Sequence, residues 1–203
     1  MTVKNKKKTV SSGLIAPHAE SSVSYWLLKS EPDAHSWEMQ KARGHKGEPW
    51  NGVRNYLARN NMRAMRLGDK GFFYHSNEGK DIVGIVEVCA LAHPDPQDAT
   101  GTWECVDVRA ICDMPQPVGL AAVKANPKLA RMSLVTSMRL SVQPVTPAEW
   151  DEVCRMGGLD PGNIGEAKTG PVANTPDRTK PPKTKPPGTE PGKTKPAKIG
   201  RKA

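Results

Sequence analysis

Short apolar runs separated by polar turns predict a set of short strands through the middle of the chain. Some runs are continuously apolar, as buried strands are, and others alternate apolar with polar residues, as half-solvated strands do. Gly84, inside the longest run, indicates a bulge or a close approach of another group to the backbone. The predicted strands cover residues 25–28, 71–75, 81–92, 103–111 and 138–142.

Helical periodicity and capping residues predict short helices between and after these strands. Ser36 is a suitable N-cap for the first helix, and Thr146 followed by Pro147 is a start signal for the last, which ends at Gly157. Pro127 divides the third segment into one or two shorter helices. The predicted helices cover residues 36–41, 53–67, 118–130 and 147–156.

This mixture of strands and short helices favours a mixed α/β (α+β) fold, a small and partly open β-barrel with helices packed around it. Closing a sheet into a barrel removes exposed edge strands. We expect the domain to cover residues 24–160. Residues 1–23 are predicted to be a disordered basic arm, and residues 161–203, with nine Pro and ten Lys or Arg, a disordered basic tail.

The net charge of +9 is concentrated at the two ends of the chain. Residues 25–160 hold 16 basic and 17 acidic side chains, whereas residues 1–24 have a net charge of +3 and residues 161–203 of +7. The basic composition therefore describes the ends and not a basic face of the domain. The Lys/Pro-rich tail has two interpretations, a nonspecific phosphate-binding segment or a solubilising spacer.

Several classes of protein are disfavoured by what the sequence lacks. No apolar run approaches the ~18 residues of a membrane span, and no secretory signal is present, so we expect an intracellular protein with no membrane partner. It would be cytoplasmic in a bacterium and nuclear in a eukaryote. The cysteines form no C-x-x-C pair, which predicts no metal site, disulfide or cofactor. Without a nucleophile or phosphate-loop motif, we predict no enzyme and no catalytic residue.

Three polar segments next to aromatic residues are the candidate binding chemistry. They are residues 29–31 after Trp26, residues 50–55 beginning with Trp50, and residues 74–77 beginning with Tyr74. Aromatic faces stack planar rings, Ser and Asn hydrogen-bond the edge of a base, and Lys or Arg contacts phosphate. The sequence therefore predicts a pocket for an unpaired nucleobase.

Long stretches of the predicted domain resemble the EVE domain family. The matching stretches are YWLLKSEPD (25–33), WNGVRNYLARNNMRAM (50–65), LGDKGFFYHSNEGK (67–80), IVGIVEV (82–88) and RLSVQPV (139–145). This resemblance implies a PUA-like barrel similar to the YTH domain, which binds N6-methyladenine in RNA. It also implies binding of modified bases, notably modified cytosines, in DNA or RNA, with no family-wide catalytic activity.

The resemblance also indicates which segments form the pocket. Lys29 and Ser30 match a segment used near the base in YTH proteins, and residues 50–55 match a W-x-G-V-R-N run in which Asn51 replaces the family's usual Asp. The predicted base-pocket residues are Trp26, Ser30, Trp50, Gly52, Val53, Asn55, Tyr74, His75, Ser76 and Asn77. The predicted phosphate contacts are Lys29, Arg54, Arg59, Arg63 and Arg139. We expect a monomeric modified-base reader whose partner is DNA or RNA.

Two other functions remain open, as do structural roles for the same residues. An enzyme acting on a modified base would use His75 and Glu31 as acid and base, and an inert barrel would leave nucleic-acid binding to the tail. Trp26 and His75 could be core residues and Trp50 a structural plug. Asn77 could be a turn residue, and Arg54 the partner of a carboxylate such as Glu31 or Glu78. The arginines of the long helix could form a solvated face, and Trp103 and Trp150 are expected to be packing residues.

Overall fold

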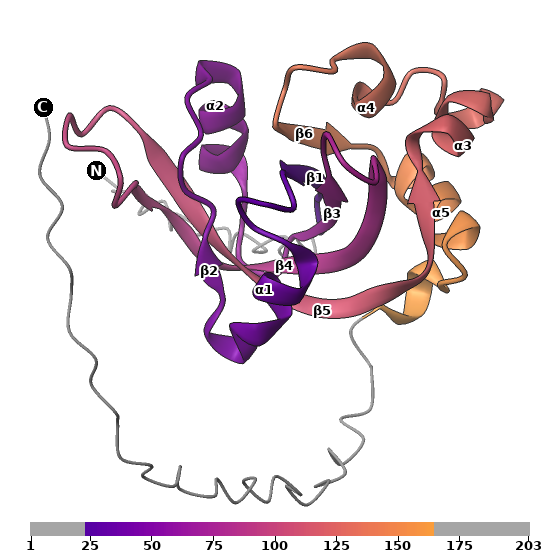
Figure 1. The fold of residues 1–203 in the computed structure, drawn as a ribbon, viewed down its shortest axis with the longest axis horizontal. Helices are drawn as coiled ribbons and strands as arrows, with labels where there is room; N and C mark the ends of the chain where they lie inside the picture. Colours follow the sequence, from indigo (N-terminus) through magenta and orange to yellow (C-terminus); the bar gives the residue numbers. More distant parts are fainter. Residues whose placement is uncertain (1–22, 165–203) are drawn as a thin grey trace, which may run out of the picture. The chain divides into compact units, whose positions relative to one another are not determined.

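The structure, a computed structural model, describes residues 23–164, and its centre is one mixed six-stranded sheet (Figure 1). The order of the strands is β2-β5-β4-β3-β1-β6, with β1 parallel to β3 and the other neighbours antiparallel. The strands are β1 (Tyr25–Ser30), β2 (Glu48–Pro49), β3 (Lys70–His75), β4 (Asp81–Pro94), β5 (Glu104–Gly119) and β6 (Val142–Val145).

Helices pack against both faces of the curved sheet: buried residues of α1 and α2 join one core cluster, and buried residues of α3 and α5 join the other. In Figure 1, α3 and α5 lie together at the right of the sheet and α2 at its upper left. The α-helices are α1 (Trp37–Ala42), α2 (Tyr56–Ala64), α3 (Leu120–Ala125), α4 (Ser133–Thr136) and α5 (Pro147–Met156). The 3-10 helices are η1 (Gly44–Lys46), η2 (Pro127–Leu129) and η3 (Pro161–Asn163). Ser36 and Thr146 are N-caps, as predicted, because their side chains accept hydrogen bonds from Met39 N and Glu149 N.

Both faces of the sheet are buried, which explains the unbroken apolar runs in β1 and β3. Neighbouring strand residues point to opposite faces. Leu27 and Phe72 therefore join one core cluster, and Leu28 and Phe73 join the other. Trp150 of α5 lies in the first cluster, stacked on Phe72 with ring centroids 4.3 Å apart, and is the packing residue that the sequence predicted.

Several element boundaries differ from the predicted ones. The helix predicted for 53–67 begins only at Tyr56, because Gly52 has a φ of +76° and Asn55 is an extended N-cap. The strand predicted for 103–111 continues to Gly119 through repeated shifts of register along β4. The closing strand predicted for 138–142 is Val142–Val145, and its Pro144 is tolerated because β6 is an edge strand.

Gly84 shows both features that the sequence indicated. The β3–β4 and β4–β5 registers shift beside it, and the Trp37 ring packs so closely on its Cα that an added Cβ would overlap the ring. Trp37 is buried, and its indole nitrogen donates to Asp113 Oδ1 at 2.6 Å. Helix α1 is therefore held against the sheet through a position that only glycine can occupy.

The predicted fold class, an α+β fold with a partly open barrel, is confirmed. Within residues 23–164 the sheet keeps two edges, β2 and β6, and short helices pack against its faces. The described structure runs to Ile164, which is buried, and no helix in it has the length and apolar content needed to cross a membrane. The predicted basic arm, 1–23, and tail, 161–203, lie outside the described residues except for Val23 and residues 161–164. At the start of the predicted tail the structure instead has η3 and the buried Ile164.

Candidate functional site

A cavity of about 390 Å³ lies beside the end of β1, between the start of α1 and the segment that follows β2. Its volume falls in the range of pockets that hold small molecules. The cavity is lined by Lys29, Ser30, Ala34, His35, Met39, Arg43, Glu48, Pro49, Trp50, Asn51, Gly52, Val53, Arg54, Gln97 and Ser141. Two of the three polar segments singled out in the sequence, 29–31 and 50–55, therefore contribute to one cavity.

Trp50 forms an aromatic wall of the cavity and is held in place from three sides. Its backbone nitrogen donates to Val106 O at 2.8 Å, which extends the short β2–β5 pairing by one residue. Its ring meets Phe73 edge-on, with centroids 5.5 Å apart, and His35 edge-on at 6.2 Å. Trp50 is only 7% exposed and belongs to the core cluster of Leu28 and Phe73, so its indole is fixed before any ligand arrives and presents little ring area to the cavity.

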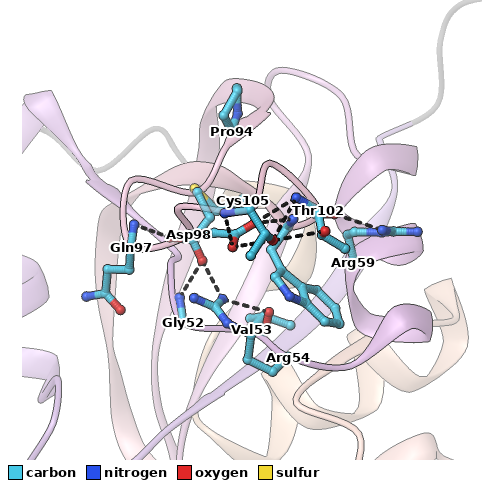
Figure 2. Close-up of polar contacts among 12 residues, drawn as sticks. Gly52, Val53, Arg54, Arg59, Pro94, Gln97, Asp98, Thr102 and Cys105 are labelled. Carbon is cyan, nitrogen blue, oxygen red and sulfur yellow. Dashed lines mark hydrogen bonds and ion pairs between the residues drawn. The ribbon is translucent and has the colours of Figure 1, made fainter.

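The buried carboxylate of Asp95 organises the rim of the cavity. Its Oδ2 accepts from Gly52 N at 2.9 Å and from Arg54 Nη1 at 2.7 Å, and its Oδ1 accepts from Gln97 N at 2.8 Å (Figure 2). Burial acts to raise the pKa of this carboxyl, but hydrogen bonds from Arg54, Gln97 and Gly52 outweigh it and leave the pKa lowered. Arg54 thus pairs with Asp95 and not with either glutamate that the sequence suggested.

Ser30 and Lys29 form the side of the cavity that belongs to β1. Ser30 Oγ donates to His35 O at 2.8 Å, which fixes the chain between β1 and α1. Lys29 Nζ donates to Met138 O at 3.1 Å and has no carboxylate partner among residues 23–164. Burial lowers the pKa of Lys29 to about 8. The ammonium is therefore protonated at neutral pH and loses its proton as the pH rises through about 8.

Two side-chain amides at the cavity have hydrogen-bonding groups to spare. Within the described residues, the amide groups of Asn51 and Gln97 make no hydrogen bond, although the backbone nitrogens of both residues do. Amides can donate to and accept from the edge of a planar heterocycle. The cavity therefore combines an indole face, free amides and the cations Lys29 and Arg54.

The remaining predicted pocket residues lie outside the cavity lining. Trp26 is buried and donates from its indole nitrogen to Asp69, while the Asn55 side chain accepts from Ala58 N as the N-cap of α2. Tyr74 belongs to the core cluster on the opposite face of the sheet from Trp50.

The rest of the third segment, residues 75–77, does not line the cavity either. His75 Nε2 accepts from Trp37 N at 3.1 Å, and burial lowers the pKa of that imidazole. Ser76 donates to Ser30 O from its backbone nitrogen and its hydroxyl, and Asn77 is an exposed turn residue with a φ of 65°. Glu31 and His75, the proposed acid and base of the enzymatic alternative, do not line the cavity.

Of the predicted phosphate contacts, some line the cavity and the others lie outside it. Lys29 and Arg54 line the cavity, whereas Arg59 lies on α2 and donates to Thr102 O, and Arg63 forms a double hydrogen bond with Glu104. Arg139 is exposed between α4 and β6.

His35, Arg43 and Gln97 line the cavity but were not predicted from the sequence. Asn51 also lines the cavity and was left out of the predicted pocket residues, although its place in the W-x-G-V-R-N run was enough reason to include it. Gln97 had no such signal, because only the β4–β5 turn brings it beside Gly52.

The described part of the chain contains neither a cluster of metal ligands nor a cysteine with a lowered pKa. No group of three or more His, Cys, Asp or Glu residues there is arranged to hold a metal ion. Cys105 lies 3.8 Å from the ring nitrogens of His93, which pairs with Asp107 at 2.8 Å. Burial raises the pKa of the Cys105 thiol to about 12, so it is not a thiolate nucleophile at neutral pH.

The fold and the cavity define a small α+β open-barrel domain with a cavity of about 390 Å³ that Lys29 and Arg54 help to line. The family model of the EVE domain matches residues 24–156, and the chain belongs to this family. Human thymocyte nuclear protein 1 is 34% identical over 170 residues, which cover 68% of this chain and 76% of that protein.

Two solved structures show the same fold. A crystal structure of an Agrobacterium tumefaciens protein is 73% identical, with a TM-score of 0.65, covering 68% of this chain and 94% of that one. The crystal structure of human THYN1 protein in complex with 5-methylcytosine-containing DNA is 34% identical, with a TM-score of 0.60, covering 68% of this chain and 99% of that one.

Proposed function

We propose that this protein is a nucleic-acid reader that takes one modified base, a modified cytosine in the first instance, into the Trp50 cavity. The observation that supports this most directly is the combination of a fixed indole wall with the unpaired amides of Asn51 and Gln97 in one cavity. A relative of the same fold, human THYN1, has been crystallised with DNA containing 5-methylcytosine. Stacking against an indole contributes on the order of 1–3 kcal/mol per base and requires a base that has left its own stack.

Each group at the cavity has a defined part in this proposal. Trp50 stacks the ring, Asn51, Gln97 and Ser30 hydrogen-bond its edge, and Lys29 and Arg54 contact the adjoining phosphates. Gly52 allows the strand to approach the backbone, because its φ of +76° excludes most side chains. Arg59, Arg63 and Arg139, together with the Lys/Pro-rich tail, would add phosphate contacts without reading the base.

The test is a titration of the full chain with labelled oligonucleotides that differ at one cytosine, which is plain, 5-methylated or 5-hydroxymethylated. A parallel strand bearing N6-methyladenine measures selectivity. Wild-type protein is expected to bind one modified strand at least several-fold more tightly than the plain strand. Equal affinity for every strand would contradict the proposal.

Variants at the cavity separate base reading from general binding. Asn51→Ala and Gln97→Ala remove side chains without hydrogen bonds in the free protein, so both should fold normally and reduce the preference for the modified strand. Gln116→Ala, an exposed glutamine on β5 away from the cavity, is the matched control and should leave the preference unchanged. Trp50→Phe keeps an aromatic ring but reduces its area and should weaken binding of the modified strand most.

A further inference from the structure

A second aromatic surface lies next to the cavity, where the start of α2 meets the turn between β4 and β5. The rings of Tyr56 and Trp103 lie with centroids 5.0 Å apart and an interplanar angle of 32°. Tyr56 is 62% exposed and Trp103 is half-buried. We call Tyr56, Trp103 and the guanidinium of Arg59, which lies 5.0 Å from the Tyr56 ring, the aromatic platform.

The platform carries a guanidinium that forms no direct ion pair within the described residues, although Glu104 is near enough for the Arg59 charge to help lower the pKa of that carboxyl. Arg59 donates to Thr102 O at 2.8 Å (Figure 2) and forms no ion pair within residues 23–164. Arg63, one turn further on, is paired with Glu104. The Arg59 guanidinium also lies 5.8 Å from the Trp103 ring. Rings and an unpaired guanidinium together are suited to a stacked base and its phosphate.

The turn that presents Trp103 is fixed by a second carboxylate. Asp98 Oδ2 accepts from Thr102 N and from Trp103 N, both at 2.7 Å, and its Oδ1 accepts from Thr100 N and Oγ1. Asp95 N donates to Trp103 O at 3.0 Å and closes the base of the turn. The backbone at Trp103 is therefore held in place in the free protein, and its ring packs beside Tyr56, which lowers the entropy cost of binding.

Arg54 connects the platform to the cavity. Its guanidinium lines the cavity, bonds to Asp95 and lies 5.7 Å from the Trp103 ring. A strand that leaves the cavity along this side passes Arg54 first and then reaches the platform.

We propose that the platform stacks the nucleobase adjacent to the one held in the cavity, so that the bound DNA strand is unpaired at two successive nucleotides. This inference rests on the proposed function for its starting point. A base inside a duplex is stacked on both sides and cannot cover the Tyr56 ring, so the adjacent base must leave the stack as well. A purely structural role for the platform does not explain Tyr56, because a side chain that is 62% exposed adds little to the core.

The experiment uses the full chain and three single-stranded oligonucleotides with one 5-methylcytosine. One strand is intact, one has an abasic site on the 5′ side of the modified base, and one has it on the 3′ side. Affinities are measured by fluorescence anisotropy for wild type, Tyr56→Ala and Leu57→Ala. Leu57, the next residue on α2 and 57% exposed, is the matched control because it lies outside the platform.

For wild type, one of the two abasic strands is expected to bind about tenfold more weakly than the intact strand. Tyr56→Ala should bind the intact strand about tenfold more weakly and should no longer distinguish it from that abasic strand, while Leu57→Ala behaves as wild type. Annealing a complementary strand across both nucleotides should weaken binding.

Several results would overturn the inference. They are equal affinity of wild type for all three strands, an abasic effect of the same size in Tyr56→Ala, or equal affinity for single strand and duplex. Failure of the proposed function is measured separately: wild type would then bind strands with 5-methylcytosine and with cytosine equally tightly. Tyr56→Ala should keep the discrimination between these two strands, because it leaves Trp50 and the cavity lining intact.

Discussion

Replacing Asp95 with asparagine is expected to loosen the rim of the cavity and to destabilise the whole domain. The Asp95 side chain is 1% exposed and accepts hydrogen bonds from Gly52 N, Arg54 Nη1 and Gln97 N. Asparagine has nearly the same shape but only one oxygen. Its amide nitrogen must therefore face at least one of these N–H donors, and the negative charge is lost.

The size of the effect follows from these contacts. A hydrogen bond to a charged group contributes roughly 1.5–3 kcal/mol, and one such bond is lost outright in Asp95→Asn. The remaining bonds lose the charge of the carboxylate: a bond from a backbone N–H becomes neutral and about half as strong, whereas the bond from Arg54 keeps only the charge of the guanidinium. Because the Arg54 side chain is 40% exposed, water replaces part of its lost partner. We expect a total loss of about 3 kcal/mol in the free energy of unfolding.

Urea denaturation of wild type and Asp95→Asn measures this difference, with an unchanged m-value as the sign that the mutation acts on stability. Glu78→Gln, a change at an exposed carboxylate, is the control and should alter stability by less than about 0.5 kcal/mol. The argument would be refuted by a loss for Asp95→Asn no larger than that of the control.

The pH dependence gives an independent check on the charge. Because hydrogen bonds lower the pKa of Asp95 in the folded state, its stabilising effect is present above the ordinary value, 3.8, and is lost as the pH falls below it. The stability gap between wild type and Asp95→Asn should therefore be constant near neutrality and shrink below about pH 4. A gap of the same size at pH 3 would contradict a role for the ionised carboxylate.

Three further predictions concern the fold, the cavity and the tail. Gly84→Ala should lower the free energy of unfolding by about 1–3 kcal/mol, because its methyl group overlaps Trp37, whereas Gly119→Ala, with open space at its Cα, should change it little; urea midpoints decide this. Affinity for a modified strand should fall as the pH rises through about 8, where Lys29 loses its proton, and Lys29→Arg should flatten that profile in anisotropy titrations. Deleting residues 165–203 should make the dependence of affinity on salt less steep without changing the ratio of modified to plain strand, whereas loss of all binding would favour the inert-barrel alternative.

Local features of the fold could be predicted from sequence because their causes lie within a few residues. Ser36 and Thr146 cap helices through bonds that span three residues, and Pro147 starts α5 because its fixed φ suits a first turn. The start of α2 was predicted too early, since the effect of Gly52 on the backbone outweighed the apolar periodicity that begins at Val53.

Only some of the residues that line the cavity could be predicted from the sequence. Both the 29–31 and 50–55 segments supply lining residues, and the long EVE-type motif made them recognisable. Tyr74 was grouped with them because it is aromatic and follows the same pattern, but alternation along β3 turns its ring into the other core cluster. Gln97 lies beside Gly52 only because the turn after β4 brings it there, and Arg59 is positioned by a bond to Thr102 O, far along the chain.

The sequence by itself determined the family, the fold class and most helices and strands, because these depend on periodicity, capping and long ordered motifs. The tertiary structure decided which polar groups share a cavity and which are used up by packing. Asp95 is the clearest case, since no pattern near it indicates that it joins Gly52, Arg54 and Gln97. Such convergence depends on how β4 and β5 pair and turn, and the path of a sheet in space is set by all of its strands together.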